Sequence, residues 1–564
     1  MLRRIVECVP NISEGRNAGV IDTVVKAASG VKGASVLDVD PGAATNRTVI
    51  TIAGDPDALL ESAFRLIERA GQLIDMRAQK GAHPRHGAVD VCPFVPVSGV
   101  TMDDCVELAR RLGERVGTEL GIPVYLYEFA ATRPERRKLP DIRVGEYEAL
   151  KDKLGRDEWA PDFGPNTWND ATARTGVCTI GARNFLIAYN VNINSRDTSI
   201  AKEVALNIRD SGRTPRTSQW KFARDEKGKK VKQPGLLKCC KATGWFIEEY
   251  GTSQVTMNLT DISVTPLHLA YEVTKQQVES YGGVVTGSEI VGLVPLSSML
   301  DAGRYYIEKQ NSGLSAAGKQ SVTTGQPESE LLEVAIRSMG LRDVSPFNPL
   351  EKIIEYMVAD ESVNLSGLSC REFCDQLSVD SPAPGGGSAS ALAGALAAAL
   401  VSMVANLTVK NRKFIKHWED MRTLAPRAQE IKSALLSAID DDTRAFNNWM
   451  DTARSGGDVQ AAVRGAIEVP LRVLSLAGEV AKLAEEVAEK GMQSSVSDSG
   501  VAASAARAAA EGACLNVLIN LGEIQDHAYR DTVRNEAMRL LHETVNNAGK
   551  TFASVMAKLE EKAE

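Results

Sequence analysis

Residues 381–409, "SPAPGGGSASALAGALAAALVSMVANLTV", carry no charged side chain. A segment of this length is long enough to cross a bilayer, which needs about 20 apolar residues. Its composition favours another structure, because Ala, Gly and Ser gain little free energy on transfer into lipid compared with Leu, Ile and Phe. An uncharged helix of small residues is typical of a helix buried on all sides in a tight bundle. We therefore expect a bundle helix here and no membrane span.

The chain after residue 362 has no strand pattern. Apolar residues recur there with helical spacing, and Ala-rich runs continue toward Glu564. We expect residues 363–564 to form an all-α helical bundle. Residues 309–330 are rich in Gly, Ser, Thr, Gln and Lys, a composition typical of a linker. We assign residues 328–362, with one helix and a turn at "PFNP", to a linker region.

The first half of the chain predicts two α/β subdomains, residues 1–182 and 183–327. The order strand, helix, two strands, helix, strand occurs in both, and is the split βαβ pattern. The expected strands are 5–10, 35–39, 47–53, 89–97, 124–129, 185–193, 244–250, 254–259 and 289–296, and the expected helices are 17–29, 56–75, 103–120, 198–209 and 265–281. We expect mixed sheets that face each other across a cleft, a favoured place for a small-molecule site.

Charge and cysteine content narrow the class of protein. The 564 residues suffice for about three or four domains. The formal net charge of −8 argues against nucleic-acid binding over the whole surface. Residues 209–241 are rich in Lys and Arg and form either a solvated insertion or a site for an anionic ligand. The nine cysteines include no CxxC pair, and Glu7 and Pro10 interrupt the N-terminal apolar stretch. We expect reduced thiols, no signal peptide and a cytoplasmic protein.

Two of the six histidines, His83 and His86, lie in "KGAHPRHGAVDVCPFVPV", before an apolar run that predicts a buried strand. Pro84 interrupts any helix here and Asp90 is the one acid close in sequence, so we expect no metal site. The loop is either an ordinary polar loop or the site of a general base, because imidazole titrates near neutral pH. Arg85 suits a carboxylate ligand, which its guanidinium can bind in a bidentate geometry.

Two further polar clusters follow predicted strands. "VPNISEGRN" contains Asn11, and "DVDPGAATNRTV" contains Asn46 and Arg47. Asn, Asp and Gly are common in turns. Each cluster is therefore either turn chemistry or part of a ligand site.

The helical half has a glycine loop, Gly385, Gly386 and Gly387, before a helix that we expect to start near Ser388. Glycine allows close backbone approach, and a helix N-terminus favours anions. No lysine follows at the position that a phosphate-binding Walker A loop requires. The alternatives are an anion site and a flexible entry loop with an N-cap.

The bundle sequence has two more polar candidates. "AIDDDTRAF" places three aspartates inside a helix, the last being Asp442. Such residues usually form a solvated face, but Ile439 and Phe446 around them favour at least one inward-facing acid. Asn516 and Asn520, one turn apart in the apolar "GACLNVLINL", either connect buried groups or contact a ligand.

Several long motifs resemble a known family. "VECVPNISEGRN", "LDVDPGAATNRTV", "KGAHPRHGAVDVCPFVPV", "EWAPDFGP" and "GARNFLIAYNVN" resemble formimidoyltransferase domains. "SPAPGGGSASALAGALAAALVSMVANLT" and "GACLNVLINL" resemble the cyclodeaminases and methenyltetrahydrofolate cyclohydrolases. The order of these motifs and the chain length are similar to the bifunctional formimidoyltransferase-cyclodeaminase family, and the resemblance covers nearly the whole chain.

This resemblance implies a folate-dependent bifunctional enzyme of histidine degradation. The first part would transfer a formimidoyl group from N-formimidoyl-L-glutamate to N5 of tetrahydrofolate and release glutamate. The second part would close the ring to 5,10-methenyltetrahydrofolate and release ammonia. The resemblance also implies polyglutamylated tetrahydrofolate as co-substrate and a homo-oligomer built as a ring of dimers.

The resemblance places the transferase base at His83, the cyclodeaminase acid at Asp442, and a folate-binding stretch that begins at Gly164 and Pro165. The full set of candidate substrate- or folate-binding residues is Asn11, Asn46, Arg47, Arg85, Gly164, Pro165, Gly385, Gly386, Gly387, Ser388, Asn516 and Asn520. Two alternatives stay open for the helical part: a methenyltetrahydrofolate cyclohydrolase, or a module that only binds folate or assembles the oligomer.

Overall fold

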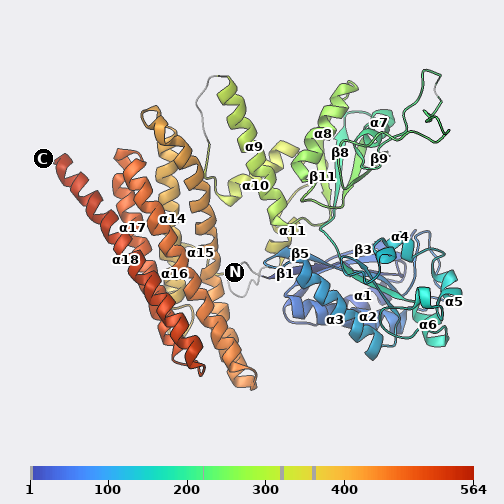
Figure 1. Cartoon of the computed structure of the whole chain (residues 1–564), viewed down its shortest axis with the longest axis horizontal. Helices are drawn as coiled ribbons and strands as arrows, with labels where there is room; N and C mark the ends of the chain where they lie inside the picture. Colours follow the sequence, from blue (N-terminus) through green and yellow to red (C-terminus); the bar gives the residue numbers. More distant parts are fainter. Residues whose placement is uncertain (1–3, 220, 318–322, 359–363, 564) are drawn as a thin grey trace. The chain divides into compact units, whose positions relative to one another are not determined.

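The computed structural model describes residues 4–219, 221–317, 323–358 and 364–563. It divides into two compact units, residues 1–303 with 332–359 and residues 304–331 with 360–564. The sheets belong to the first unit, and a bundle of long helices forms most of the second (Figure 1). The prediction of a multidomain chain with α/β sheets followed by a helical region is confirmed.

The first sheet has seven strands: β1 (Ile5–Cys8), β2 (Asn11–Ile12), β3 (Ala34–Gly42), β4 (Arg47–Gly54), β5 (Val89–Ser98), β6 (Val124–Glu128) and β7 (Cys178–Ala182). Their order is β1-β4-β2-β5-β7-β6, with β3 beside β4 and β1 also paired with β5. Strands β5, β7 and β6 are parallel neighbours, and the other pairs are antiparallel. Because β5, β7 and β6 are parallel, their first residues meet at one edge of the sheet.

Three long helices cover this sheet: α1 (Ala18–Ser29), α2 (Pro56–Leu73) and α3 (Met102–Glu119). Helix α3 begins with a capping box between Thr101 and Asp104, which satisfies two free backbone N–H groups. The shorter elements between β6 and β7 are α4 (Leu139–Ile142), α5 (Leu150–Lys153), α6 (Asp170–Thr175) and the 3-10 turns Pro134–Arg136, Tyr147–Ala149 and Asp157–Trp159. Sequence periodicity predicted none of these, because a repeat cannot be recognised within three to six residues.

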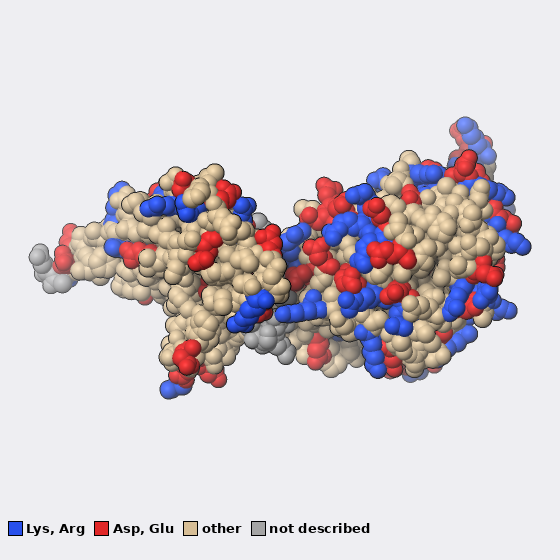
Figure 2. Space-filling model, turned by 90° about the horizontal axis from the view of Figure 1, so that it is seen from below, with Lys and Arg blue, Asp and Glu red and all other residues tan. Residues whose placement is uncertain are grey.

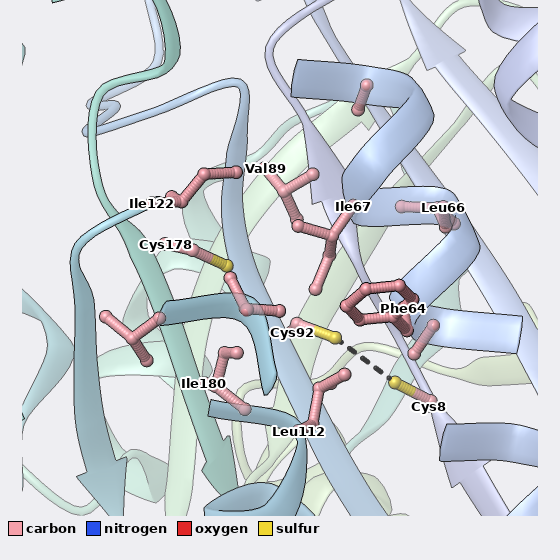
Figure 3. Close-up of a cluster of buried hydrophobic side chains, with 14 of the residues drawn as sticks. Cys8, Phe64, Leu66, Ile67, Val89, Cys92, Leu112, Ile122, Cys178 and Ile180 are labelled. Atoms are coloured by element: carbon pink, nitrogen blue, oxygen red, sulfur yellow. Dashed lines mark hydrogen bonds between the residues drawn. The ribbon is translucent and has the colours of Figure 1, made fainter. Parts of the chain in front are cut away.

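The core of the first unit lies between the sheet and these helices (Figure 3). Phe64 and Ile67 of α2 face Cys8 and Cys92, whose sulfur atoms are 3.4 Å apart. Burial raises the pKa of the Cys8 thiol, since a thiolate would lie in apolar surroundings. All nine cysteines are free thiols.

The second sheet consists of β8 (Ile187–Ile193), β9 (Cys240–Ile247), β10 (Thr252–Leu259) and β11 (Val285–Val291), with α7 (Ser199–Ile208) and α8 (Leu267–Ser280) as connections. Its order is β11-β8-β10-β9, and every neighbouring pair is antiparallel. The expectation of a mixed sheet is therefore wrong for this subdomain. The physical reason is that β10 lies between β8 and β9, the two strands that α7 connects. The cleft between the subdomains stays a prediction.

The basic insertion between α7 and β9 forms an arm with isolated strand pairings, Arg213 with Gln233, Arg216 with Phe222 and Arg224 with Lys230. Its side chains are mostly exposed, as a solvated insertion would be. Trp220 lies outside the described residues. Figure 2 shows Lys and Arg interspersed with Asp and Glu on the visible face of the first unit.

The helices that follow are α9 (Leu296–Ala316), α10 (Glu328–Met339), α11 (Pro349–Lys352) and α12 (Ile354–Met357). The interpretation of residues 309–330 as a linker is corrected in part, since residues 309–316 continue α9. Lys, Gln and Ala have good helix propensity, which outweighs the few Gly and Ser residues here. Residues 318–322 and the proposed boundary at 362 lie outside the part that the structure describes.

The second unit is built from α13 (Cys370–Leu377), α14 (Gly386–Val409), α15 (Trp418–Ser455), α16 (Val459–Lys490), α17 (Val496–Leu521), α18 (His527–Ala563) and the 3-10 turns Arg412–His417 and Gln493–Ser495. Helix α14 packs against α15, α16 and α17, and its alanines let these backbones approach closely. By length and composition alone α14 would suffice to cross a membrane, and 56% of its most apolar window is buried inside the bundle. The expectation of burial on all sides is corrected, because Leu396 and Met403 are exposed.

Glu7 of β1 supplies a prediction about pH and stability. Burial raises its pKa from 4.5 to about 7, with Arg183 opposing and Glu355 adding to the shift. A raised folded-state pKa stabilises the fold below pH 4.5, and this contribution is lost as the pH rises to about 7. Glu7→Gln should therefore reduce the loss of first-unit stability between about pH 5 and 8 by up to about 3 kcal/mol.

Thermal unfolding of the intact protein, followed through the first-unit transition at both pH values, measures this effect. Glu114→Gln, an exposed acid on α3, serves as the control and should leave the pH dependence unchanged. An identical pH dependence in Glu7→Gln and the natural chain would contradict the prediction.

Candidate active sites

The polar clusters predicted around Asn46 and His83 meet at the edge of the first sheet. Asn46 Oδ1 accepts a hydrogen bond from the Gly15 backbone at 3.0 Å, and its Nδ2 donates to the Lys80 carbonyl at 3.1 Å. A Cβ at Gly81 would lie 2.1 Å from the Thr45 carbonyl oxygen, so only glycine lets the two loops approach. The amide of Asn46 thus holds three separate loops together.

A second contact ties the same loops. The Glu14 carboxylate accepts hydrogen bonds from the backbones of Arg16 and Asn17 at 2.8 and 3.0 Å, and from Gln79 Nε2 at 3.1 Å. Gln79 also contacts Asn46. Gln79 was not among the predicted site residues, because a single glutamine in a polar loop gives no sequence signal.

His83 is held in one neutral tautomer. Its Nδ1 lies 2.7 Å from the Pro84 carbonyl oxygen, which can only accept, so Nδ1 carries the hydrogen. Its Nε2 contacts Nη1 of Arg47, which can only donate, so Nε2 presents its lone pair. Burial lowers the pKa of His83, and the positive charge of Arg47 lowers it further. The imidazole is therefore neutral near pH 7, the state that a general base needs.

Behind His83 lies a buried ion pair between Asp90 of β5 and Arg143. The His86 backbone donates to Asp90 Oδ1 at 2.9 Å. Burial raises the pKa of Asp90, and the charge of Arg143 opposes this shift. The sequence did not point to Arg143, because it lies far from Asp90 along the chain in a segment without a motif.

His86 is fully buried, and neither ring nitrogen has a hydrogen-bond partner among the described residues. Burial lowers its pKa to about 3, so the ring stays neutral. The two histidines of the loop thus have different environments, one beside a cation at the surface and one inside the protein.

A cavity of about 580 Å³ lies beside this loop and is lined by Pro84, Arg85, Pro140, Arg143, Gly145, Glu146 and Glu148. Nη2 of Arg85 donates to Glu148 Oε1 and to the Gln79 carbonyl, both at 2.8 Å. Glu146 lies 3.6 Å from the same guanidinium. Arg85 is thus held by two protein carboxylates.

Gly164 and Pro165 lie near the start of β6, at the same sheet edge as the start of β5. Trp168 of this loop packs against Tyr147 with ring centroids 5.8 Å apart, and the Tyr147 backbone donates to the Arg85 carbonyl at 2.8 Å. The predicted folate stretch is therefore connected to the His83 loop. Asn11 lies inside the sheet on β2, where its Nδ2 donates to the Val9 carbonyl at 2.8 Å.

The second unit brings Asp442 of α15 to the glycine loop at the start of α14. The Ser388 hydroxyl lies 3.2 Å from Asp442 Oδ2 and 3.0 Å from the Ile439 carbonyl oxygen. A Cβ at Gly387 would lie 2.2 Å from Asp442 Oδ1, so glycine is required for this approach. Burial raises the pKa of Asp442, and hydrogen bonds from Ser388 oppose the shift.

The three consecutive aspartates have different partners. Asp440 is buried and accepts hydrogen bonds from the Leu365 and Ser366 backbones at 2.6 and 3.3 Å. Asp441 forms ion pairs with Arg444, at 2.7 Å, and with Arg472. The expectation that at least one of the acids turns inward agrees with Asp440 and Asp442.

The two asparagines of α17 also separate. Asn516 faces the glycine loop, since a Cβ at Gly386 would lie 3.2 Å from its Nδ2. Asn520 Nδ2 donates to the Ala466 carbonyl at 3.0 Å and thereby connects α17 to α16. Gly386, Gly387, Ser388, Asp442 and Asn516 therefore lie together. Gly385 is the N-cap of α14, directly before them.

No group of three or more His, Cys, Asp or Glu side chains that could hold a metal ion is found within the described ranges. The two sites instead offer a neutral imidazole beside a guanidinium, and a shielded carboxyl beside a glycine loop. These are proton-transfer groups for acid–base chemistry.

Comparison with known proteins assigns both units. Family models for the formiminotransferase domain, N-terminal subdomain, match residues 5–183, for the formiminotransferase domain residues 188–359, and for formiminotransferase-cyclodeaminase residues 369–539. The formimidoyltransferase-cyclodeaminase of Rattus norvegicus is 40% identical over 572 aligned residues, which cover 99% of this chain and all of that protein.

Two shorter relatives match one unit each. The glutamate formimidoyltransferase of Streptococcus pyogenes serotype M1 is 39% identical and covers 55% of this chain and 95% of its own length. The methenyltetrahydrofolate cyclohydrolase of Methylorubrum extorquens is 34% identical and covers 33% of this chain and 95% of its own length. A solved formiminotetrahydrofolate cyclodeaminase from Thermotoga maritima aligns with 36% of this chain and all of its own, at 31% identity and a TM-score of 0.33.

The family models and relatives define a two-part protein of the folate one-carbon class, with a transferase-like first part and a cyclodeaminase-like second part. The chain belongs to the formimidoyltransferase-cyclodeaminase family.

Proposed function

We propose that the chain is a folate-dependent bifunctional enzyme of histidine degradation. Its first unit transfers the formimidoyl group from N-formimidoyl-L-glutamate to N5 of tetrahydrofolate and releases glutamate. Its second unit converts 5-formimidoyltetrahydrofolate to 5,10-methenyltetrahydrofolate and ammonia. The observation that carries this proposal is the full-length match to the rat enzyme, in a chain with a separate acid–base site in each unit.

In the transfer step, N5 of tetrahydrofolate attacks the formimidoyl carbon, and His83 Nε2 takes the N5 proton. The same imidazole then gives a proton to the glutamate nitrogen as the carbon–nitrogen bond breaks. The tautomer of His83 supports this role, because Nδ1 donates to Pro84 and leaves Nε2 as the basic atom. Arg47, Arg85 and the loops around Asn46, Gly164 and Pro165 supply the surrounding polar groups.

In the ring closure, N10 attacks the same carbon and the amidine nitrogen leaves as ammonia. Asp442 supplies or relays the proton that the leaving nitrogen needs. Burial raises the pKa of Asp442 and so keeps part of the carboxyl protonated at a higher pH than an exposed aspartate. The Gly385–Gly387 loop, Ser388 and Asn516 form the neighbouring ligand surface.

Gly387→Ala tests this second site directly. The added methyl group would collide with Asp442, so ammonia release from 5-formimidoyltetrahydrofolate should fall roughly 10–100-fold, the effect of overpacking by a few kcal/mol. Gly465→Ala on α16 is the matched control, since a Cβ there meets nothing within 4 Å. Unchanged ammonia release in Gly387→Ala would argue against Asp442 as the acid.

A cyclohydrolase is the second candidate for the helical unit, and the identity to the Methylorubrum enzyme supports it. Supplying 5-formimidoyltetrahydrofolate and 5,10-methenyltetrahydrofolate separately decides between them. Ammonia release from the first compound supports the cyclodeaminase. If the protein hydrolyses 5,10-methenyltetrahydrofolate but releases no ammonia from 5-formimidoyltetrahydrofolate, the helical unit is a cyclohydrolase. If it catalyses neither reaction, the helical unit is a module that only binds folate or assembles the oligomer.

The form of the folate, the absence of a metal, the cellular location and the subdomain limits are part of the same proposal. Tetrahydrofolate acts as a polyglutamylated co-substrate, no metal takes part, and the protein is cytoplasmic. The subdomain limits are 1–182 and 183–327, with the cyclodeaminase at 363–564. Product analysis with and without a chelator, and with folates of different tail length, checks the first two points.

We also propose a homo-oligomer, assembled as a ring of dimers. An apolar face on α14 and α17 supports it, since Leu396, Leu515 and Ile519 are 56%, 68% and 73% exposed in the single chain. Large exposed apolar patches commonly mark protein interfaces. Light scattering of the purified protein measures the assembly, and a monomeric mass would overturn the proposal.

A further inference from the structure

Arg47 is a partly buried cation that forms no ion pair with a carboxylate of the described residues. It stands at the start of β4, and its Nε is buried without a hydrogen-bond partner among the described residues. The neighbouring acid, Asp90, is held in an ion pair by Arg143. Removing a charge from water is costly unless an opposite charge compensates. The environment of Arg47 is therefore suited to receive an anion, and a guanidinium binds a carboxylate through two parallel hydrogen bonds.

The guanidinium of Arg47 lies against the proposed base. Nη1 of Arg47 contacts His83 Nε2, the nitrogen whose lone pair has to accept a proton. The second ring nitrogen is already used, because Nδ1 donates to the Pro84 carbonyl. While Arg47 stays in this position, His83 has no basic atom available for substrate.

We propose that Arg47 acts as a latch: its guanidinium blocks Nε2 of His83 until a ligand carboxylate binds the guanidinium. A carboxylate that binds Arg47 draws the guanidinium away from Nε2, so that the base becomes available only when its substrate is present. This inference rests on the proposed role of His83 as the transferase base. The carboxylate belongs either to N-formimidoyl-L-glutamate or to the glutamate tail of the folate.

The charges that face His83 give the direction of the accompanying pKa change. They are Arg47 from β4, Arg143 from the segment after α4, and Asp90 from β5, with the Pro84 carbonyl in its own loop. The two cations lower the pKa of His83, and Asp90 and the carbonyl raise it. A carboxylate on Arg47 would cancel one cation. The pKa of His83 would then rise, and the imidazole would become a stronger base as the substrate arrives.

The rate at which a reagent acylates His83 tests the latch without any measurement of enzyme activity. Diethyl pyrocarbonate acylates the unprotonated nitrogen of an imidazole, and peptide mass spectrometry reports the rate at His83. In the intact protein at about pH 7.5, Arg47→Gln should react at least about ten-fold faster at His83, because a charge-assisted hydrogen bond no longer occupies Nε2. Acetate, a minimal carboxylate probe, should speed the reaction of the natural chain at constant ionic strength but not that of Arg47→Gln. An equal His83 rate in the natural chain and the variant would overturn the latch.

Controls keep this outcome specific. Arg77→Gln removes an exposed arginine that pairs with Asp75 at 2.6 Å, and it should leave the His83 rate unchanged. His527, exposed in the second unit, is the internal reference within each sample. Arg47→Lys keeps the charge and should restore part of the protection, which separates loss of the latch from general loosening of the loop.

Kinetics separate the two sources of carboxylate. If the latch binds the substrate glutamate, Arg47→Gln should raise the KM for N-formimidoyl-L-glutamate about ten-fold or more and leave the KM for tetrahydrofolate nearly unchanged. If it binds the folate tail, the KM for tetrahydrofolate should rise instead, and tetrahydropteroate, which lacks the tail, should be insensitive to the variant. No change in either KM would overturn the carboxylate role. Activity that survives His83→Ala would remove the base proposal, whereas the acylation rates would still decide whether Arg47 covers Nε2.

Discussion

Asp442→Asn should lower the rate of ammonia release by roughly 10²–10⁴-fold. Glutamate release should continue at nearly the natural rate. Asparagine keeps the size of the side chain and removes its titratable proton, and a positioned acid contributes a factor of this order. Asp442 belongs to α15 in the second unit, whereas His83 belongs to the first. Each unit has its own hydrophobic core, so a conservative change in one should not unfold the other.

The accumulation of 5-formimidoyltetrahydrofolate is the measurement. Asp451→Asn is the matched control, because this acid lies on the same helix, is exposed and pairs with Arg454 at 3.7 Å. The control should release ammonia at the natural rate. If Asp442→Asn abolished glutamate release in a folded protein, the two-site interpretation would fail, and a shared site would have to replace it.

The pH dependence has a definite sign. Burial raises the pKa of Asp442, so the protonated fraction falls as the pH increases through that raised value. If Asp442 acts as the acid, ring closure should slow on the alkaline side of this pKa.

The sequence predicted those helices and strands in which apolar residues recur at a regular spacing. Helix α2 follows directly from the spacing of Leu59, Leu60, Phe64 and Ile67, all of which are buried. The short helices between β6 and β7 have no such repeat, and tertiary contacts fix them. One example is Tyr147, whose backbone donates to Arg85 and whose ring packs on Trp168.

The candidate sites divide in the same way. The loop of Asn46 was recognisable because polar residues cluster after a predicted strand, and the loop of His83 because two histidines precede one. The structure brings these two loops together. Arg143 could not be found, because its partner Asp90 is distant in sequence and ion pairing leaves no periodic signal. Asn520 has the sequence context of Asn516, yet its amide connects two helices, since one turn of α17 changes which neighbour it meets.

The surroundings of α14 could not be predicted fully, because a helix can be covered by a second copy of the chain as well as by its own chain. An uncharged helix predicts burial, but a sequence does not show whether the covering atoms come from the same chain. Leu396 and Met403 are exposed here, so intramolecular packing covers only part of the helix. The homo-oligomer proposed above would cover the rest.

The complementary result concerns His83→Ala, which should lower glutamate release by roughly 10²–10⁴-fold. Neither Arg47 nor Asp90, which both face the imidazole, can replace it as the base, since Arg47 is a donor only and Asp90 is held by Arg143. Ring closure on supplied 5-formimidoyltetrahydrofolate should continue, because that reaction depends on Asp442. His527→Ala, at an exposed histidine, is the control and should alter neither reaction. Glutamate release that survived in His83→Ala would move the base to another residue.

A mixture of His83→Ala and Asp442→Asn proteins then tests what the fusion of the two units contributes. Each mutant supplies one reaction, so the mixture should still convert N-formimidoyl-L-glutamate to ammonia. In the natural chain both sites share one polypeptide, which raises the effective concentration of the intermediate at the second site. In the mixture, chains that carry out the transfer cannot close the ring, so the intermediate has to reach a different chain. Ammonia should therefore appear after a longer lag than in the natural protein at equal site concentration. Equal lags would mean that the intermediate equilibrates with solvent before ring closure, and that covalent linkage of the two units gives no kinetic advantage.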